Sequence, residues 1–532
     1  MLRNHALIIR MRNVAGRNRW FSAAFLVGFF LRLLAMIGYP GALWFSGDSY
    51  VYIGAALRSI PEPSRPTAYS RFLRLLLPFP DASKPTGYSL FLRLLLPFHS
   101  FTLVTFIQHM MGLSVAVMIY ALLRRYGVSR RWATIATLPQ LLDGFIVEDE
   151  HMIMAESIAM FCLMLATLLL LWTTRTRWWV ALLAGLLVGY TAIAYPTDIV
   201  VIGLFPLFIA IRSLRGHGWK KIQGWLVTVA VAAGCLAPVG AYMAWFHSYA
   251  GVWSISNAQG FYLWGRVSSF ADCAKIKAPA SLMKYCPTQP YKDRTPPGQF
   301  IWFAPQVHQD MNSVGGPTSA QGNELLTEFD IDAIKSQPLG YVKAVAKGVL
   351  MAFEWPMKNY PDTGTVYYYD FHLNYATSTY NLLPTKNQEW IPPDTSADSA
   401  YNDWLAYGRQ DPGVVVKPVA VVIAGYERVV NTLGPLLAVI FVAGLGGVLA
   451  VERRPWRLRW RRRRGSMFPW AASVVLLVFP IAAADFDYRY LLPAIAFACL
   501  AAGLGFAPAR ATPEPTTPGA GTAEEPEAAT AV

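Results

Sequence analysis

Charged side chains are scarce in this sequence. Lys, Arg, Asp and Glu make up 15% of its 532 residues, while hydrophobic residues make up 54%. A soluble globular domain carries about 25% charged residues, so this composition excludes a set of ordinary soluble domains. Trp and Tyr, by contrast, are plentiful, at 18 and 26 residues, which is typical of the aromatic belts at the two bilayer interfaces. We therefore expect an all-α polytopic membrane protein.

Motifs of several other protein classes are missing as well. No Walker A or Rossmann glycine pattern is present, so we expect no nucleotide pocket. His151 is the one histidine among the acidic residues discussed below, so no metal motif is evident and we expect no cofactor. A divalent cation held by carboxylates and water stays an open alternative. The net charge of +14 does not indicate nucleic acid, because the arginines cluster between apolar runs, where they meet anionic membrane lipids.

About 20 apolar residues cross a bilayer as a helix. The run 20–38 follows a basic stretch, as in a signal peptide, but it contains Arg32 and lacks a small-residue cleavage site, so we expect an uncleaved first span. A count of nine or eleven spans is an alternative, because 414–431 could cross the membrane or lie along its surface. We predict about ten spans, at residues 20–38, 101–123, 132–147, 152–172, 178–195, 197–211, 224–246, 432–450, 467–484 and 489–506.

The charges next to the spans predict the orientation. The N-terminal segment and every second turn are rich in arginine, up to the eight arginines between Arg453 and Arg464. The short turns on the other side carry acids instead: Glu148, Asp149 and Glu150, then Asp198, then Asp485 and Asp487. This segregation predicts a multi-pass protein of the cell membrane with both termini in the cytoplasm.

The span pattern divides the chain into a basic cytoplasmic N-terminus, a bundle, a loop domain and a second membrane segment. The bundle contains a first outer loop at 39–100, where Pro66–Phe79 recurs almost unchanged as Pro85–Phe98. We expect each copy to form a helix lying on the membrane surface, although a recent duplication without functional meaning is an alternative. The predicted divisions are 1–19 (N-terminus), 20–246 (bundle), 247–413 (an extracytoplasmic loop domain of mixed structure), 414–506 (C-terminal membrane segment) and 507–532 (a disordered cytoplasmic tail). 

Cys273 and Cys286 lie in the loop domain, whereas the other three cysteines lie in apolar spans. An extracytoplasmic location permits a disulfide between them, and two reduced cysteines are the alternative.

Asp48 follows the first span in a Ser-Gly-Asp-Ser-Tyr sequence. A carboxylate at the rim of the hydrocarbon is partly desolvated, which raises its basicity, so Asp48 could remove a proton from an acceptor hydroxyl. Capping the next helix is the structural alternative.

Further acids lie on the same predicted side. Glu148, Asp149, Glu150 and His151 occupy one turn, where the first two could be solvated. Glu156 follows inside an apolar span, where an acid costs a few kcal/mol and by default indicates a functional site.

Arg489 is the cation of this predicted site. It lies between two tyrosines at the last outer turn, beside Asp487, and its planar guanidinium suits a pair of phosphate oxygens. Snorkelling to lipid headgroups is the alternative. Arg32 lies deeper, near the middle of its span, where a charge normally faces a partner, for which Asp143 is one candidate.

In their order and shared side, these residues resemble the GT-C superfamily of membrane glycosyltransferases, which use lipid-phosphate-linked sugars and include protein O-mannosyltransferases, the lipid A aminoarabinose transferase and actinobacterial cell-envelope transferases. The sequence departs from its relatives at Tyr195–Asp198, where they often place an Arg-Pro pair. The motifs that carry the resemblance are Arg32, Gly47-Asp48-Ser49-x-x-Tyr52, Lys84-Pro85-Thr86-Gly87-Tyr88, Met154-Ala155-Glu156 and Arg489-Tyr490-Leu491-Leu492-Pro493.

The resemblance implies a GT-C-like fold and an extracytoplasmic glycosyltransferase whose donor is a polyprenyl-phosphate sugar, with mannose the leading candidate. The acceptor is a hydroxyl of an envelope glycan, a secreted protein or a peptide natural product. Asp48 is then the catalytic base, with Glu156 the second catalytic candidate. The expected substrate-binding residues are Arg489, Tyr490, Arg32, Tyr52, Lys84, Tyr88, Glu150, His151, Asp198 and Asp487. A lipid-linked glycan flippase, which would place polar residues through the span centres, and a glycan polymerase or ligase are the alternatives.

Overall fold

The computed structural model describes Gly16 and residues 18–45, 48–57, 84–173, 175–217, 222–374, 397–408, 414–449 and 456–507. Across these ranges all regular structure is helical, apart from one isolated parallel bridge between Leu43 and Met152. The prediction of an all-α protein therefore agrees with the structure. The described part of 247–413 contains helices and irregular segments.

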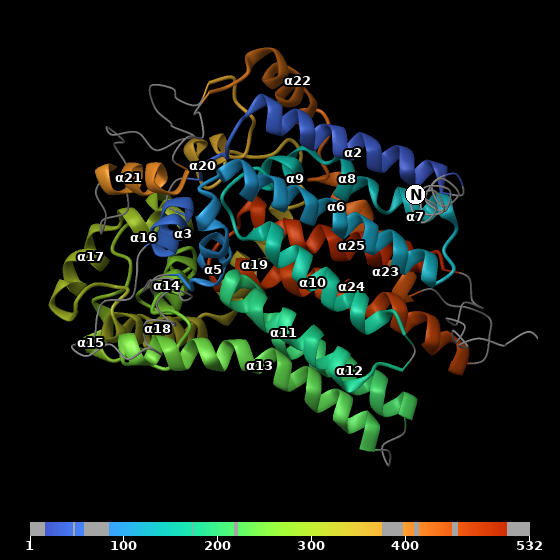
Figure 1. Cartoon of the computed structure of the whole chain (residues 1–532). Helices are drawn as coiled ribbons and strands as arrows, with labels where there is room; N and C mark the ends of the chain where they lie inside the picture. Colours follow the sequence, from blue (N-terminus) through green and yellow to red (C-terminus); the bar gives the residue numbers. More distant parts are fainter. Residues whose placement is uncertain are drawn as a thin grey trace, which may run out of the picture.

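Long helices run side by side through the body of the molecule, and short helices gather at one end (Figure 1). The described N-terminal end of the chain lies at the opposite end of the molecule from α14 (Gln259–Ser268) and α17 (Pro305–Met311) (Figure 1). The helices of the body are α2 (Arg19–Gly38), α6 (Phe101–Arg125), α10 (Glu156–Leu171), α11 (Trp178–Ala194), α12 (Val201–His217), α13 (Ile222–Ala250), α22 (Lys417–Glu427), α23 (Pro435–Leu449), α24 (Trp456–Ala483) and α25 (Leu491–Gly505).

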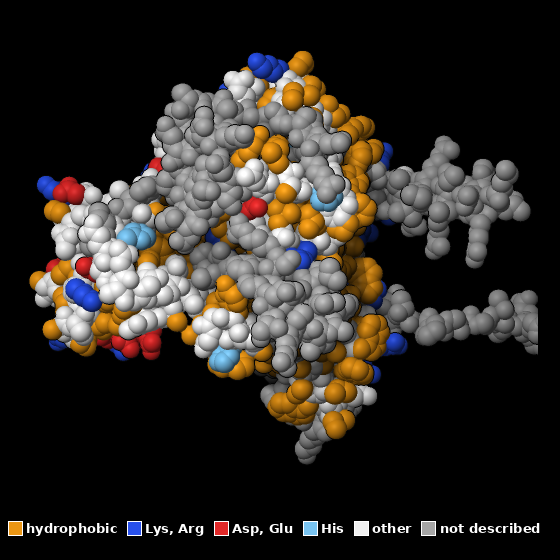
Figure 2. All heavy atoms as spheres, turned by 60° about the vertical axis from the view of Figure 1, so that its left-hand side comes forward, with side chains coloured by type: hydrophobic (Ala, Val, Ile, Leu, Met, Phe, Trp, Pro, Cys, Tyr) orange, Lys and Arg blue, Asp and Glu red, His pale blue; other side chains and the backbone are white. Residues whose placement is uncertain are grey.

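Five described helices are long and apolar enough to cross a membrane, and they match five of the predicted spans. The predicted spans 152–172, 178–195 and 432–450 correspond to the shorter apolar helices α10, α11 and α23. Large apolar side chains are exposed on the outer faces of the body, for example Val229 and Leu236 on α13 and Val439 and Val442 on α23. In Figure 2 hydrophobic side chains gather along the right-hand side and the lower part of the molecule, as expected where lipid is the solvent.

The predicted span 132–147 is wrong as a continuous helix. The chain forms three short helices there, α7 (Arg130–Ile135), α8 (Leu138–Leu142) and α9 (Gly144–Asp149). Pro139 is the second residue of α8, in the first turn, where its missing N–H needs no partner. Asp143 has extended backbone and its Oδ1 accepts from the amides of Phe145 and Ile146, which ends α8 and caps α9.

The second copy of the sequence repeat forms α5 (Gly87–Leu95) and a short 3-10 helix that ends at Phe98. Phe91 and Leu92 are buried, whereas Leu94 and Phe98 are exposed, so one face of this segment packs on the bundle. The first copy, 66–79, lies outside the described residues.

The loop domain has a hydrophobic core of its own, centred on Trp264 and Phe261. Its helices are α14 (Gln259–Ser268), α15 (Ala280–Met283), α16 (Pro297–Phe303), α17 (Pro305–Met311), α18 (Ala320–Ser336), α19 (Pro338–Met351), α20 (Thr363–Tyr367) and α21 (Ala397–Gly408).

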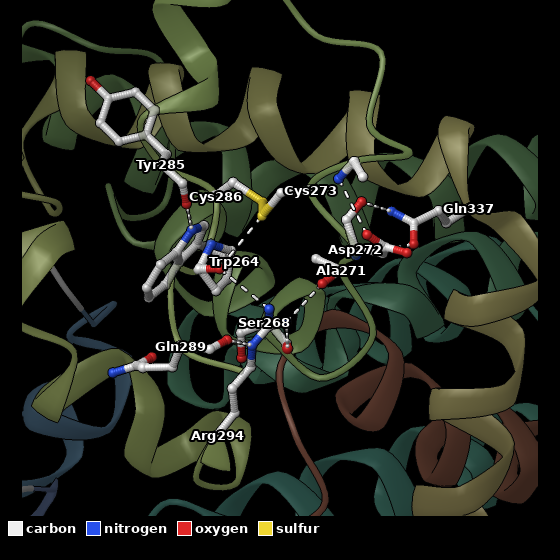
Figure 3. The surroundings of a disulfide bond; sticks show 12 residues. Trp264, Ser268, Ala271, Asp272, Cys273, Tyr285, Cys286, Gln289, Arg294 and Gln337 are labelled. Atoms are coloured by element: carbon white, nitrogen blue, oxygen red, sulfur yellow. Dashed lines mark hydrogen bonds between the residues drawn. A yellow bond between two sulfur atoms is a disulfide. The ribbon is translucent and has the colours of Figure 1, made fainter. Parts of the chain in front are cut away.

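A disulfide joins Cys273 to Cys286 beside this core (Figure 3). Arg294 lies against the same loop and donates to the carbonyl oxygens of Ser268, Ala271 and Gln289. The segment 268–289 is therefore held together by the Cys273–Cys286 disulfide and by the guanidinium of Arg294.

We expect three of the five cysteines to react with an alkylating reagent when the protein is unfolded without reductant, because Cys162, Cys235 and Cys499 are free and buried. After reduction, all five should react. Mass spectrometry of the alkylated chain checks this, and five modified cysteines before reduction would contradict the disulfide.

Candidate active site

Asp48 is the first residue of α3 (Asp48–Leu57), at the end of the helical body that faces the loop domain (Figure 1). Its Oδ1 contacts the ammonium of Lys84, and its Oδ2 accepts from Nη1 of Arg489 at 2.5 Å. The three side chains are 11–17% exposed. One carboxylate is thus held between two cations in a nearly dry environment, where charge–charge interactions are stronger than in water.

Arg489 is oriented by several neighbours. It lies in the 3-10 helix η5 (Tyr488–Tyr490), and its Nε donates to Oδ2 of Asp487 at 3.0 Å. Its guanidinium carbon lies 4.8 Å from the ring centre of Phe45 and 5.2 Å from that of Tyr490. Stacking of this kind favours Arg over Lys and fixes the plane of the guanidinium.

Glu156 begins α10 and is 1% exposed. Its Oε1 lies 3.6 Å from Nη1 of Arg489, which makes an ion pair but no hydrogen bond. Arg489 therefore stands among three carboxylates, those of Asp48, Asp487 and Glu156. A guanidinium with this much negative charge around it stays charged and stays in place.

Lys84 completes the cationic side of the site. Its Nζ lies 5.6 Å from the ring centre of Tyr52. Burial and the nearby Arg489 guanidinium hold the pKa of the Lys84 ammonium well below its ordinary value. A lysine in this condition depends on adjacent anions to keep its proton, and Asp48 is the anion in contact with it.

Backbone pairing fixes the segment that carries Asp48. Leu43 donates to the carbonyl of His151 and accepts from the amide of Ile153, at 2.9 and 3.2 Å. Ser49 adds a hydroxyl hydrogen bond to the carbonyl of Ile153. The chain before Asp48 is thereby attached to the turn that leads into α10 and Glu156.

That turn is held in place by a fully buried polar network. Arg32 donates from Nε and Nη2 to the two carboxylate oxygens of Glu150, both at 2.8 Å. His109 joins Glu150 to His151 through its two ring nitrogens, at 2.9 and 3.0 Å. Gln108 donates to the carbonyl oxygens of Glu150 and Met152. These side chains are between 0% and 1% exposed.

The five N–H groups of Arg32 are all used within the protein, because the remaining donors bond to the carbonyls of Gly28, Gln140 and Leu141. The geometry favours a structural role for Arg32 over the predicted contact with substrate. The suggested partner Asp143 is also wrong: its other oxygen accepts from the amide of Thr432. Glu150 and His151, predicted to bind substrate, belong to the same buried network.

Sequence reasoning missed Gln108 and His109. Both lie on α6 within the apolar run 101–123. The available signal was their polarity, since polar groups inside a span usually have a specific partner.

Glu150→Gln should destabilise the protein by about 3–5 kcal/mol, because Arg32 then keeps a buried charge without a counter-charge. The double variant Arg32→Met, Glu150→Met should lose less than the two single variants together. Thermal unfolding of the purified protein in detergent measures both. Additive losses would mean that the two side chains are not coupled.

The acids of the turn 148–151 are not solvated, which excludes the alternative of a solvated turn for Glu148 and Asp149. They are 0% and 2% exposed. Asp198 is 1% exposed and lies in the 3-10 helix η2 (Pro196–Val200). Tyr88 packs edge-on against Tyr52, with ring centres 4.9 Å apart.

The hydroxyl of Tyr88 donates to Oε1 of Gln108 at 2.6 Å. This joins the first outer loop to the buried network rather than leaving the hydroxyl for a ligand. Among the residues that the structure describes, no three His, Cys, Asp or Glu side chains form a group that could hold a metal ion.

Asp485 attaches the loop domain to the turn between α24 and α25. Its carboxylate accepts from Arg266 at 3.0 Å, from the hydroxyl of Tyr360 at 2.6 Å and from the amide of Gly298 at 2.8 Å. Burial raises the pKa of Asp485, and Arg266 opposes that shift. Because Asp487 and Arg489 follow in the same turn, the loop domain and the charged site are mechanically connected.

No family model matches this sequence, and no curated protein matches it. Similar solved structures include the S. cerevisiae protein O-mannosyltransferase Pmt1–Pmt2 complex bound to the sugar donor, at 14% identity and a TM-score of 0.34, covering 48% of this chain and 36% of that one. The oligosaccharyltransferase of Archaeoglobus fulgidus in the apo form has 13% identity and a TM-score of 0.39, covering 92% of this chain and 50% of that one. The complex of the same organism's oligosaccharyltransferase AglB with an inhibitory peptide and a dolichol-phosphate has 13% identity and a TM-score of 0.36, covering 91% and 50%.

The chain thus spans between 36% and 50% of the length of these structures. With TM-scores below 0.4 the likeness carries no argument of its own, and the residues of the site must carry the function.

Proposed function

We propose that this chain is a membrane glycosyltransferase of the GT-C type, which transfers a monosaccharide from a polyprenyl-phosphate carrier to a hydroxyl acceptor on the extracytoplasmic side. The observation that carries the proposal is Asp48, held between Lys84 and Arg489 at the end of the bundle that faces the loop domain. A base and two phosphate-binding cations are the groups that this reaction needs. Mannose is the sugar that the resemblance suggests.

Lys84 and Arg489 suit the leaving group. A polyprenyl phosphate leaves as an anion, so fixed cations that face the phosphate stabilise the transition state as negative charge develops. Arg489 can offer a pair of N–H groups in one plane, which matches two phosphate oxygens. The phosphate also gives the buried ammonium of Lys84 an anion in place of Asp48, which favours its charged form.

The same two cations also hold Asp48, so the donor phosphate competes with Asp48 for them. When the phosphate takes over Lys84 and Arg489, the Asp48 carboxylate loses its counter-charges and becomes a better base. Donor binding and activation of the base are coupled in this way.

In the transfer step, the acceptor oxygen forms a bond to the anomeric carbon of the sugar. The bond from that carbon to the phosphate oxygen breaks, and its electron pair leaves with the polyprenyl phosphate. Asp48 takes the hydroxyl proton. The atoms and charges balance without a cofactor.

Membranes that contain the chain, incubated with polyprenyl-phosphate [¹⁴C]mannose, test the proposal. We expect label to pass to a hydroxyl-bearing product, and no transfer when nucleotide-linked mannose is the donor in the absence of the lipid carrier. Identification of the product by mass spectrometry names the acceptor. Movement of labelled lipid across the bilayer without transfer would support the flippase alternative instead.

We expect a cysteine introduced at Tyr291, which is 67% exposed, to react with a membrane-impermeant reagent on whole cells, and a cysteine at Thr512 to react after permeabilisation alone. The reason is the segregation of arginine and acid between alternate turns. If both positions react on the same side, the predicted orientation is wrong, and the proposed extracytoplasmic site with it.

A further inference from the structure

Buried polar atoms without a hydrogen-bond partner occur next to the charged site. Among the described residues they include both carboxylate oxygens of Glu156 and of Asp198, the hydroxyl of Tyr195 and Oγ1 of Thr197. Glu156 and Asp198 are each 1% exposed, and Tyr195 is 4% exposed. Buried polar groups are normally paired, and an unpaired one costs a few kcal/mol. Four neighbouring residues with unpaired atoms therefore need an explanation.

Packing brings these residues to the phosphate-binding side. The ring centre of Tyr195 is 6.3 Å from that of Tyr490, the neighbour of Arg489. A methyl group added at Gly87 would lie 2.5 Å from the carbonyl of Ile193, so the segment that follows Lys84 touches the chain just before Tyr195. Glu156 is within ion-pair distance of Arg489, and its charge acts on both Asp198 and Tyr195.

The chemistry of the unpaired atoms defines the missing partner. Carboxyl oxygens accept hydrogen bonds, so the unpaired oxygens of Glu156 and Asp198 fit a ligand that supplies O–H or N–H donors. The hydroxyls of Tyr195 and Thr197 can donate or accept. A ring with several free hydroxyl groups supplies such donors from adjacent carbons.

We propose that Glu156, Asp198, Tyr195 and Thr197 form the subsite for the sugar ring of the donor, and that this subsite selects a sugar with free hydroxyl groups and no acidic group. The inference rests on the proposed function, because it places the sugar beside the phosphate that Arg489 and Lys84 hold. Beyond the proposed function, the inference specifies the class of sugar and the residues that determine the specificity for it.

Two other readings fit less well. A metal ion would need grouped ligands, and the described residues contain no such group. An acidic sugar would bring its carboxylate against Glu156 and Asp198, where like charges in a dry environment repel each other.

Asp330 is a useful comparison, since it is also buried with both oxygens unpaired. It lies on α18 in the loop domain, and burial alone raises its pKa, without a charged neighbour. Asp198 differs because the charge of Glu156 acts on it and the unpaired groups of Tyr195 and Thr197 adjoin it in the chain.

Binding of a matched set of donors to the purified full chain in lipid nanodiscs tests the subsite. The set comprises a short-chain polyprenyl phosphate without sugar and the same lipid phosphate carrying mannose, its 2-, 4- and 6-deoxy analogues, or mannuronic acid. We expect at least one deoxy analogue and the mannuronic acid donor to bind roughly 10-fold or more weakly than the mannose donor, because each lacks or opposes a hydrogen bond to a charged acceptor.

In Asp198→Asn, affinity for the mannose donor should fall by a similar factor, and discrimination against one deoxy analogue should disappear. Tyr195→Phe is a second variant that keeps the ring, and it should lose discrimination at one hydroxyl. Asp330→Asn is the matched control, for which we expect wild-type preferences. Equal binding of all deoxy donors to the wild type, or unchanged preferences in Asp198→Asn, would overturn the subsite.

The lipid phosphate without sugar separates the two proposals. If it binds while sugar hydroxyls make no difference, the subsite is wrong and the phosphate site survives. If neither the lipid phosphate nor any donor binds, the proposed function fails, and the subsite fails with it.

Discussion

Asp48→Asn is expected to lower the rate of sugar transfer by roughly 10² or more, the scale of losing a general base. Asn has nearly the same size and caps a helix about as well as Asp, so expression and thermal stability should stay near wild type. Single-turnover transfer from polyprenyl-phosphate mannose measures the rate directly, without a contribution from product release.

Donor affinity should be unchanged or higher in the same variant. In the wild type, Asp48 occupies both Lys84 and Arg489, and the donor phosphate must compete with it. Asn carries no charge, so the phosphate meets freer cations. A slow enzyme that binds its donor more tightly separates loss of a base from general damage, which would weaken binding and rate together.

Glu156→Gln is the control for the assignment of the base. Glu156 is paired with the same guanidinium at 3.6 Å and has no hydrogen bond to it, so its loss should alter donor affinity more than the chemical step. Normal turnover in Asp48→Asn together with a dead Glu156→Gln would transfer the base role to Glu156. Two active variants would refute the mechanism.

Arg489→Ala should raise the dissociation constant for the donor by roughly 100-fold or more, the upper scale for lost hydrogen bonds between charged groups. Three carboxylates, of Asp48, Asp487 and Glu156, would then face the phosphate with Lys84 as the remaining cation. Arg489→Lys keeps the charge but loses the planar pair of donors and the stacking on Phe45, so an intermediate loss of about 10-fold is expected.

Arg266→Lys is a matched substitution outside the phosphate site. Arg266 pairs with Asp485 and holds the loop domain, so this variant should affect stability more than affinity for the lipid phosphate. Titration with polyprenyl phosphate alone measures that affinity in all three variants. Wild-type affinity in both Arg489 variants would assign the phosphate to another cation, with Lys84 first in line.

The sequence by itself determined the class of protein and predicted where the candidate site lies. Apolar runs long enough to cross a bilayer are visible in one dimension, because each span needs about 20 consecutive residues. A residue next to the end of a span lies at a membrane interface. Asp48, Asp198 and Arg489 could therefore be predicted to lie at the same interface before any contact was known. Glu156 was identifiable for the same reason, as an acid at the edge of an apolar helix.

The partners of these residues were decided by the tertiary structure. Asp48 and Arg489 are 441 residues apart, and Arg32 pairs with Glu150 rather than with Asp143. Hydrophobic periodicity shows which residues of one helix avoid water, but it does not show which helices are neighbours. The neighbours of a membrane helix are even harder to predict from periodicity, because a helix can face lipid or protein with the same apolar side chains.

Two further features also lay beyond sequence reasoning. The break between α8 and α9 within 132–147 depends on Asp143, whose carboxylate bonds both to the start of α9 and to Thr432. The unpaired oxygens of Glu156 and Asp198 become evident when every neighbouring donor has been placed. Composition and charge assign a residue to a depth and a side, because the bilayer acts on each segment alone. Contacts between segments arise from packing, and packing is a property of the whole fold.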